Sequence, residues 1–364
     1  MKPLSKPISK KLVEGLIDVE SFPKAPVTIR EVAAMAGVSV STVSRVLNNP
    51  HSVKEEKRKR VLNAIKDLNY VPNPVARALG TNKIGTIAAI VPNIINTCAA
   101  EMVRGALEEL EKHGFDLLLY TSNEEVAREE SYSQILKNKI VEGAIFIAGC
   151  TNELNFEELS SIMPVALIDR YENTPCVDVL TVDEQLGMNR LVEHLVDFGH
   201  RDIGLLTGDI RTPAAVSRIK KFKQALTACG LPFRSEFLAS SEWTMQGGYH
   251  AFMKLMNRER NPTAIVASSD IVALGALSSA HEMHIRVPEE VSIVGFDNFP
   301  ESKFSIPALT TLNYPNFKLG KLAAKSILNR LNHACPSGQR KILPLELLKR
   351  NSSGCYITKQ HTNK

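Results

Sequence analysis

The stretch "TIREVAAMAGVSVSTVSRVLN" (Thr28–Asn48) holds two short helical patterns separated by a single glycine. Thr28 and Glu31 have the spacing of a capping box, which predicts the start of the first helix. Gly37 can adopt the left-handed backbone conformation that ends this helix. Ser39 can then cap a second helix, which is built largely of small polar residues. The pattern predicts a helix-turn-helix, a motif whose second helix enters the major groove of DNA.

A third helical pattern follows, from Glu55 to about Asn69. Its apolar periodicity predicts an inner side made of Val61, Leu62, Ile65 and Leu68. In the second helix the same periodicity turns Val43, Val46 and Leu47 to the core and Val40, Ser41, Ser44 and Arg45 outward. Exposed hydroxyl groups at a helix N-terminus suit phosphate groups, and an arginine suits a phosphate or a guanine edge. The alternative is a purely structural three-helix unit with a polar face.

The charge of the chain is uneven along its length. Residues 1–83 carry 15 Lys and Arg against 7 Asp and Glu, whereas the other residues carry 29 against 32. A basic N-terminal region on a slightly acidic body indicates that this region meets a polyanion. The 364 residues suffice for two or three domains. No apolar run reaches the roughly 18 residues of a membrane span, and the six scattered cysteines favour free thiols over a zinc or disulfide framework.

Two further segments sharpen the prediction for the N-terminal region. An irregular stretch with a short apolar helix, "YVPNPVARAL" (Tyr70–Leu79), precedes a strand that opens "IGTIAAIVP" (Ile84–Pro92). Together with the helix-turn-helix, these segments resemble the headpiece of the LacI/GalR family of bacterial transcription regulators. The resemblance implies a DNA-binding domain over residues 27–72 and a hinge helix with its linker over residues 73–83.

The resemblance also implies roles for individual residues of this head. Val40 and Ser41 occupy the two positions that choose bases. Leu79 occupies the position at which the family wedges a leucine between central base steps of the minor groove, which kinks the duplex. The other implied DNA contacts are Thr28, Ser39, Thr42, Ser44, Arg45 and Asn48 in the helix-turn-helix and Asn73 and Ala76 in the hinge helix. Lys54 departs from the family pattern, which usually has a capping serine there, and a capping box shifted to Ser52 could replace it.

From Ile84 onward, apolar strand patterns alternate with helical patterns. The strands are expected at "IGTIAAIV", "FDLLLYT", "GAIFIA", "PVALID", "DIGLLTG", "TAIVASS" and "VSIVGF". Helices are expected at Ala99–His113, Glu184–Phe198, Val216–Cys229, Gln246–Asn257 and Asp270–Met283. Such alternation predicts parallel sheets covered on both faces. Because this region is longer than one sheet normally needs, we expect two lobes that face a ligand-binding cleft.

This body resembles the regulatory core of the same family, which is similar to periplasmic sugar-binding proteins. The likeness lies in "ALIDR", "LTVDEQLG", "SSDIVALGAL", "VPEEVSIVGFDN" and "PALTTLNYP". It implies an effector-binding and dimerisation core over residues 84–355, with an N-lobe of about 84–180 plus 311–337 and a C-lobe of about 183–308 plus 341–355. The chain would cross between the lobes near Leu180–Asp183, Phe296–Asn298 and Thr310–Tyr314, and the helix Asn316–Asn332 would return to the N-lobe.

The resemblance further implies an effector site in the cleft. Arg218 and Asp297 occupy the positions of the family's effector-binding arginine and aspartate, and Trp243, the only tryptophan, occupies that of its stacking aromatic. An arginine and an aspartate can share adjacent hydroxyls while a ring covers the C–H side, which suits a sugar or polyol. The alternatives are a surface ion pair for Arg218, a turn cap for Asp297 and an ordinary core position for Trp243.

Four positions of this site depart from the family pattern. Cys98 stands where aromatic residues are common, Ser269 where asparagine is common, Tyr314 where glutamine is common, and Lys221 where glycine is frequent. Cys98, Ser269 and Tyr314 remain candidate effector contacts. The departures leave two possibilities open, a larger ligand or control by a protein partner in place of a small molecule.

Catalytic and metal-binding patterns do not stand out in the sequence. No glycine fingerprint for a dinucleotide or a phosphate follows a strand, and no nucleophile turn is present. Asp169, Asp183, Asp270 and Asp297 fall at strand ends, without the spacing of paired acids, a triad or a metal site. We therefore expect a binding protein with no cofactor and no metal, and not an enzyme.

The residues and the resemblance together predict an all-α helix-turn-helix headpiece joined to an α/β core of two Rossmann-like subdomains, like periplasmic binding proteins. The predicted function is sequence-specific binding to a near-palindromic double-stranded DNA operator by a repressor whose affinity is controlled by a small molecule, a sugar or a related metabolite. A cytoplasmic, nucleoid-associated homodimer or higher oligomer is expected, with no membrane partner. A flexible extension is expected at residues 1–26 and a tail at 356–364. The alternatives are an α/β solute-binding protein and a regulator controlled by a protein partner.

Overall fold

The computed structural model describes residues 27–71, 84–149, 154–170, 175–332 and 338–356. The chain divides into two compact units, Met1–Ile84 and Gly85–Lys364, called here the head and the core. The predicted extension at 1–26 and the hinge helix and linker at 73–83 lie outside the described residues, as does the predicted tail apart from Tyr356. Among the described residues, no helix has the length and apolar character needed to cross a bilayer.

Within its described residues, 27–71, the head has the α-helices α2 (Ile29–Ala36), α3 (Val40–Asn48) and α4 (Glu55–Asp67), with the short 3-10 helix η2 (Pro50–Ser52) before α4. The predicted capping box is present, because the Thr28 amide donates to the Glu31 carboxylate at 2.6 Å and the Glu31 amide donates to the Thr28 hydroxyl at 3.4 Å. Gly37 takes the left-handed conformation with a φ of 60°. Ser39 caps α3 by accepting the Thr42 amide at 3.3 Å.

Two details of the third helix differ from the prediction. Leu62 is 50% exposed, and the fully buried positions of α4 are Val61 and Ala64. Each residue turns a helix by about 100°, so Leu62 leaves the inner face that its neighbour Val61 occupies. The shifted capping box does not form either, because the hydroxyl of Ser52 donates to the Asn49 carbonyl at 2.7 Å. The helix begins after Lys54 without a side-chain cap.

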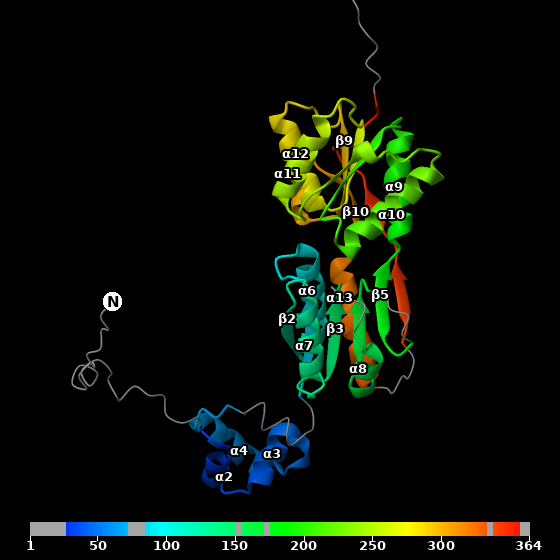
Figure 1. The fold of residues 1–364 in the computed structure, drawn as a ribbon. Coiled ribbons are helices and arrows are strands. Elements are labelled where there is room, and N and C mark those ends of the chain that lie inside the picture. Colours follow the sequence, from blue (N-terminus) through cyan, green and yellow to red (C-terminus); the bar gives the residue numbers. More distant parts are fainter. Residues whose placement is uncertain (1–26, 72–83, 150–153, 171–174, 333–337, 357–364) are drawn as a thin grey trace, which may run out of the picture. The chain divides into compact units, whose positions relative to one another are not determined.

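The N-lobe of the core is a parallel six-stranded sheet in the order β11-β5-β4-β3-β1-β2. Its strands are β1 (Thr86–Val91), β2 (Asp116–Thr121), β3 (Gly143–Ile147), β4 (Val165–Ile168), β5 (Asp178–Val182) and β11 (Arg340–Leu343). Its helices are α6 (Thr97–Glu111), α7 (Val126–Leu136), α8 (Phe156–Ile162) and α13 (Asn316–Asn332) (Figure 1). The central strands are buried along their whole length, which is the pattern of parallel strands covered on both faces.

The C-lobe is a second six-stranded sheet in the order β12-β10-β9-β8-β6-β7, in which only β12 is antiparallel to its neighbour. Its strands are β6 (Ile203–Thr207), β7 (Leu238–Ser240), β8 (Ala264–Ala267), β9 (Ser292–Asp297), β10 (Thr310–Asn313) and β12 (Glu346–Leu348). Its helices are α9 (Glu184–Asp197), α10 (Pro213–Ala228), α11 (Met245–Met256) and α12 (Asp270–Glu282), with 3-10 turns η3 (Ser235–Phe237) and η4 (Pro300–Lys303). Two lobes of this kind confirm the predicted fold class.

The chain passes between the two sheets three times; one predicted passage is wrong, and one observed passage was not predicted. The first follows β5, as expected, and the second lies between β10 and α13. No passage occurs at Phe296–Asn298, because β9 and β10 are neighbours in one sheet. The third joins β11 to β12. Residues 341–343 therefore belong to the N-lobe and residues 311–313 to the C-lobe, opposite to the predicted lobe bounds.

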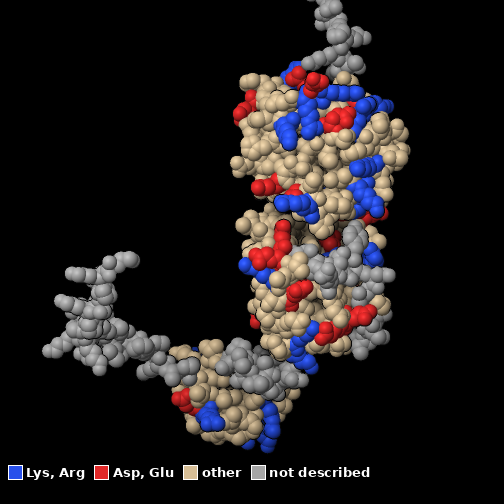
Figure 2. Space-filling view, in the orientation of Figure 1, with Lys and Arg blue, Asp and Glu red and all other residues tan. Residues whose placement is uncertain are grey.

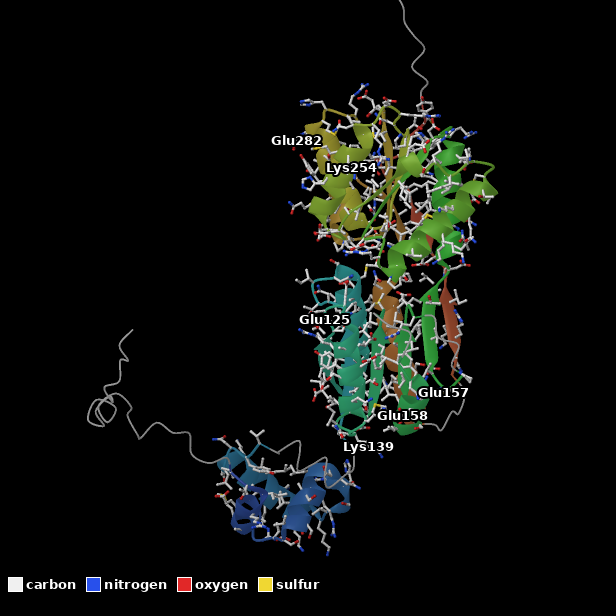
Figure 3. All side chains as sticks on the ribbon, viewed as in Figure 1. Glu125, Lys139, Glu157, Glu158, Lys254 and Glu282 are labelled. Carbon is white, nitrogen blue, oxygen red and sulfur yellow. The ribbon has the colours of Figure 1, made fainter. Side chains whose placement is uncertain are left out.

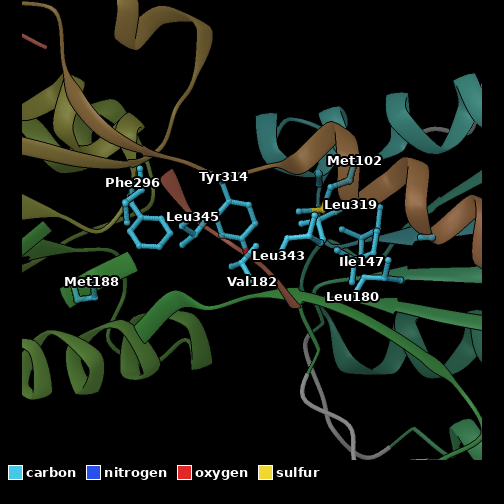
Figure 4. Close-up of a cluster of buried hydrophobic side chains, with 14 of the residues drawn as sticks. Met102, Ile147, Leu180, Val182, Met188, Phe296, Tyr314, Leu319, Leu343 and Leu345 are labelled. Atoms are coloured by element: carbon cyan, nitrogen blue, oxygen red, sulfur yellow. The ribbon is translucent and has the colours of Figure 1, made fainter. Parts of the chain in front are cut away.

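Buried apolar side chains continue from one lobe to the other through these crossings (Figure 4). Tyr314 follows β10, and Leu343 and Leu345 flank the crossing between β11 and β12. In the N-lobe, α13 and α6 touch backbone to backbone, because a Cβ on Gly320 would lie 1.7 Å from the Met102 carbonyl oxygen. The crossing segments thus belong to the same buried apolar cluster as the side chains of both lobes.

Candidate functional site

The first candidate site is the exposed side of α3 in the head. Val40 is 42% exposed, and Ser41, Arg45 and Asn48 are exposed beside it. The Ser39 hydroxyl lies 2.9 Å from the hydroxyls of both Ser41 and Thr42, which gathers three of the predicted DNA contacts at the N-terminus of the helix. Free N–H groups and the helix dipole favour a phosphate at this end.

The other predicted DNA contacts are placed differently. The Thr28 hydroxyl donates to the Glu31 carboxylate at 2.8 Å, so this side chain is engaged in the capping box. The Ser44 hydroxyl accepts the Asn48 amide at 3.4 Å one turn further along α3. Asn73, Ala76 and Leu79 lie outside the described residues.

The second candidate site lies in the core, around the buried guanidinium of Arg218 on α10. A nitrogen of this group lies 3.7 Å from a carboxylate oxygen of Asp297 and 3.7 Å from one of Glu184. The same side chain donates to the Ser268 carbonyl. It also lies over two aromatic rings, 4.4 Å from the centroid of Phe296 and 5.6 Å from that of Trp243. Arg218 is therefore held by two carboxylates, a carbonyl and two rings.

Asp297 ends β9 beside this arginine, and its backbone φ of 119° is in a region that side chains rarely adopt. The Ser269 hydroxyl donates to its second carboxylate oxygen at 2.7 Å. Burial raises the pKa of the Asp297 carboxyl to about 7, although Arg218 acts in the opposite direction. A strained residue whose carboxyl can carry or release a proton near neutral pH is typical of a functional site.

Trp243 forms a wall of the same site. Its ring is pressed against Gly208, where a Cβ would lie 2.0 Å from a ring atom, and its N–H donates to the Thr212 hydroxyl at 3.4 Å. The side chain is only partly buried. Its fixed orientation leaves an aromatic face beside Arg218, as an arrangement for stacking on a ligand requires.

Two charged residues of this site, Glu184 and Lys221, were not among the predicted effector contacts. Glu184 is the first residue of α9. One oxygen of its carboxylate lies 2.6 Å from the Lys221 ammonium, and the other lies 3.7 Å from Arg218. Burial alone would raise the pKa of Glu184, but the two cations outweigh it and hold that pKa below its usual value. The sequence signal for Lys221 was its replacement of a frequent glycine. For Glu184, a signal was its place directly after the β5 crossing.

The N-lobe contributes a third acid, Asp169, at the carboxyl end of β4 with a φ of 55°. Burial raises the pKa of Asp169 to about 7, while a hydrogen bond from Tyr314 acts in the opposite direction. Burial also raises the pKa of the Tyr314 hydroxyl well above its usual value. The sequence predicts for Asp169 only that it is an acid at a strand end, and not that it belongs to this site.

Cys98 reaches the same region from the first turn of α6. Burial raises the pKa of its thiol well above the usual value, and the nearby carboxylate of Asp297 adds to this effect. A thiol with a raised pKa stays protonated at physiological pH. The structure thus brings together Arg218, Trp243, Ser269 and Asp297 by direct contact, and it places Cys98 and Tyr314 within electrostatic range of that group.

Ionisable groups around Arg218 are paired with one another. Among the described residues, no group of three or more His, Cys, Asp or Glu could hold a metal ion. On the visible face of the core, acidic and basic side chains are interspersed (Figure 2). The arrangement around Arg218 offers donors, acceptors and an aromatic face to a polar ligand.

Comparison with known proteins addresses what kind of protein carries these two sites. Residues 28–73 match the family model "Bacterial regulatory proteins, lacI family", and residues 192–353 match that of a periplasmic binding protein-like domain. Catabolite control protein A of Priestia megaterium is 34% identical over 308 residues, which cover 84% of this chain and 93% of that protein. The chain belongs to the lacI family of bacterial regulatory proteins. This lacI-family chain is thus a DNA-binding transcriptional regulator.

Other members of the lacI family show the same likeness. HTH-type transcriptional regulator DegA of Bacillus subtilis is 32% identical over 331 residues, covering 90% of this chain and 98% of that protein. The structure of the lac repressor dimer bound to operator and the anti-inducer ONPF has a TM-score of 0.81 at 27% identity, covering 91% of this chain and all of that one. A complex of the regulator CelR with cellobiose has a TM-score of 0.66 at 27% identity, covering 90% of this chain and all of that one.

Proposed function

We propose that this regulator is a repressor whose α3 reads the major groove of an operator. The observation that carries the proposal is the exposed cluster at the N-terminus of α3, where Val40 and Ser41 stand beside the Ser39 and Thr42 hydroxyls. Hydroxyls and helix N–H groups there suit backbone phosphates, while Arg45 suits a phosphate or a guanine. Val40 can pack on a thymine methyl, and Ser41 can pair with several bases.

Because Val40 and Ser41 offer few hydrogen bonds, operator choice depends in part on DNA deformation. Leu79, in the position of the family's minor-groove wedge, would supply that deformation together with Asn73 and Ala76. Two heads in a homodimer would read two half-sites of a near-palindrome. The dimeric lac repressor bound to its operator supports this assembly.

The effector of the core is a neutral, hydroxyl-rich molecule, a sugar or a related metabolite. Both cations of the cleft, Arg218 and Lys221, are already paired with carboxylates, so the site has no spare positive charge for a phosphate. Arg218, Asp297 and Ser269 can share ligand hydroxyls, and Trp243 can cover a C–H face. The complex of the related regulator CelR with cellobiose supports this class.

Ligand binding would control DNA binding by favouring one arrangement of the two lobes. A ligand that binds one arrangement better than the other shifts the population, and the hinge segments of a dimer would follow the N-lobes. Release of Leu79 from the minor groove would then weaken operator binding. Both induction and corepression fit this scheme. The protein would act in the cytoplasm, at the nucleoid, and would catalyse no reaction.

Gel-shift titration with DNA from the region upstream of the protein's own gene tests this function. We expect specific binding that falls steeply as salt rises, because bound counterions are released from the phosphates. Leu79→Ala should weaken operator binding far more than binding to unrelated DNA. Equal losses on both DNAs would contradict the wedge role. Absence of DNA binding with and without candidate sugars would contradict the regulator itself.

If this protein binds DNA but responds to no sugar in the same titration, the result would instead support control by a protein partner. Trp243→Ala provides the matching variant for the cleft, and we expect it to abolish the response to an active sugar while DNA binding in the absence of sugar stays unchanged. Lys254, exposed on α11 (Figure 3), is a control position, and Lys254→Gln should leave both properties unchanged.

A further inference from the structure

A cavity of the core lies among the crossing segments and is lined by residues other than those around Arg218. It has a volume of about 320 Å³ and is called here the crossover cavity. Its walls are Arg190 of α9, Asn313 and Pro315 before α13, Lys318 in the first turn of α13, and residues 343–346 between β11 and β12. Metabolite-binding pockets have volumes of about 300–1,000 Å³, so this cavity has room for a small molecule.

The crossover cavity carries more positive than negative charge. Arg190 and Lys318 contribute cations and Glu346 contributes the one carboxylate of the lining. Among the described parts of the chain, neither cation has a carboxylate within ion-pair distance. The Arg190 guanidinium donates to the Leu345 carbonyl, which fixes it at the wall and leaves other N–H groups of the fork available. Two such cations favour an anionic ligand group.

The rest of the wall is apolar and rigid. Pro315, Leu343, Pro344 and Leu345 line the cavity, and the two leucines are buried in the cluster that joins the lobes (Figure 4). Prolines fix the backbone φ and thus hold the walls in place. An apolar wall beside two cations suits an anion with a short carbon skeleton rather than a bare inorganic ion.

We propose that the crossover cavity is a second ligand site, which binds a small organic anion, a carboxylate or a phosphate monoester, through Lys318 and Arg190. The site itself does not depend on the proposed sugar site. The two sites also differ in available positive charge, because in the cleft Arg218 and Lys221 are both paired with carboxylates.

The cavity is linked to the cleft by hydrogen bonds. Asn313 accepts the Asn298 side-chain amide at 2.9 Å, and Asn298 directly follows Asp297. Arg350 donates to the Asn298 oxygen at 2.7 Å and so holds this residue, which has a φ of 58°. Because the crossings also connect the two lobes, an anion that prefers one arrangement of them would change ligand affinity in the cleft, and the effect would be reciprocal. This coupling rests on the proposed function of the cleft.

Calorimetric titration of the full chain at constant ionic strength tests the site. The probes are glycerol 3-phosphate, succinate and, as the neutral control, glycerol. We expect at least one anion to bind once per chain with a Kd below about 1 mM, and the stronger of the two identifies phosphate or carboxylate as the preferred group. Glycerol should not bind. The site is overturned if neither anion binds.

Charge-removing variants then locate the bound anion. Lys318→Gln and Arg190→Gln should each weaken binding about tenfold, the loss of one charge-assisted hydrogen bond. Lys254→Gln removes the same charge from an exposed position of α11 and should leave the affinity unchanged (Figure 3). Anion binding that is insensitive to both Lys318→Gln and Arg190→Gln, or equally sensitive to Lys254→Gln, would overturn the assignment.

Fluorescence of Trp243, the only tryptophan, reports the coupling separately. We expect the bound anion to change this fluorescence in the wild type and not in Lys318→Gln. An anion that binds with the predicted sensitivity but leaves Trp243 unchanged would overturn the coupling. That result is distinguishable from failure of the sugar site, which is read from sugar titrations without anion.

Discussion

Replacement of Asp169 by asparagine should stabilise the core, and the gain should grow with pH. In the folded protein the pKa of this carboxyl is raised to about 7, chiefly by burial, from an ordinary value of 3.8. A raised pKa means that the folded state holds the proton more tightly than the unfolded state. The stability that the protonated Asp169 carboxyl contributes is fully present below pH 3.8 and is lost as pH rises through about 7.

The size of the effect follows from the same pKa. At pH 8 the charged carboxylate costs at most about 4 kcal/mol, and at pH 5 at most about 2 kcal/mol, because each pKa unit corresponds to about 1.4 kcal/mol. Asp169 is partly exposed, so we expect about half of each limit. Asparagine keeps an oxygen for the hydrogen bonds from Tyr314 and Thr181. Asp169→Asn should therefore gain about 2 kcal/mol at pH 8 and about 1 kcal/mol at pH 5.

Guanidinium denaturation at pH 5 and pH 8, followed by Trp243 fluorescence, measures this gain. Asp116→Asn, at an exposed position of β2, is the matched control and should keep the pH dependence of the wild type. A destabilised Asp169→Asn at pH 8, or a gain that is the same at both pH values, would refute the view that this acid is held at an energetic cost. Such a cost is expected where a side chain serves binding rather than folding.

Three further predictions concern packing, pH and the head. Gly320→Ala should lower the thermal midpoint of the core by several degrees, because its Cβ would lie 1.7 Å from the Met102 carbonyl oxygen; an unchanged midpoint would contradict the close contact of α13 with α6. Burial lowers the pKa of His194 to about 4, so the folded protein should lose stability as pH falls from 6.5 toward 4. The loss is at most about 2 kcal/mol at pH 5. His194→Gln should flatten this pH dependence in denaturation experiments. Thr28→Ala removes the capping box and should speed hydrogen exchange of the α2 amides about fivefold, the equivalent of about 1 kcal/mol, whereas unchanged exchange would show that the cap contributes nothing.

The head was predictable in detail because its signals are local. Thr28 with Glu31, Gly37 and Ser39 each act on residues no more than five positions away, and all three devices appear in the structure. The predicted burial of Leu62 was wrong, because apolar character alone does not decide which of two adjacent helical residues faces inward. Helix boundaries in the core were also close, because most begin at a capping side chain.

Lobe assignment needed tertiary information. Strand β11 pairs with β5, and β12 pairs with β10, and paired residues are at least 33 positions apart in the sequence. Both are short, and nothing in their own residues says which sheet they join. Glu184, one of the two carboxylates beside Arg218, was missed for the same reason: it meets Arg218 and Lys221 only when α9 packs against α10. The sequence could show an arginine and an acid in the right places, but not that Arg218 and Lys221 are both paired with carboxylates.

We expect two symmetric copies of α3 in a dimer to read the operator. Selection of binding sequences from a random duplex pool by the purified full-length protein, followed by sequencing, tests it for an operator of any sequence. We expect an enriched near-palindrome with two half-sites. Arg45→Ala, which changes a side chain exposed on α3, should lose that enrichment. No enriched motif, or a single asymmetric half-site retained by Arg45→Ala, would contradict it.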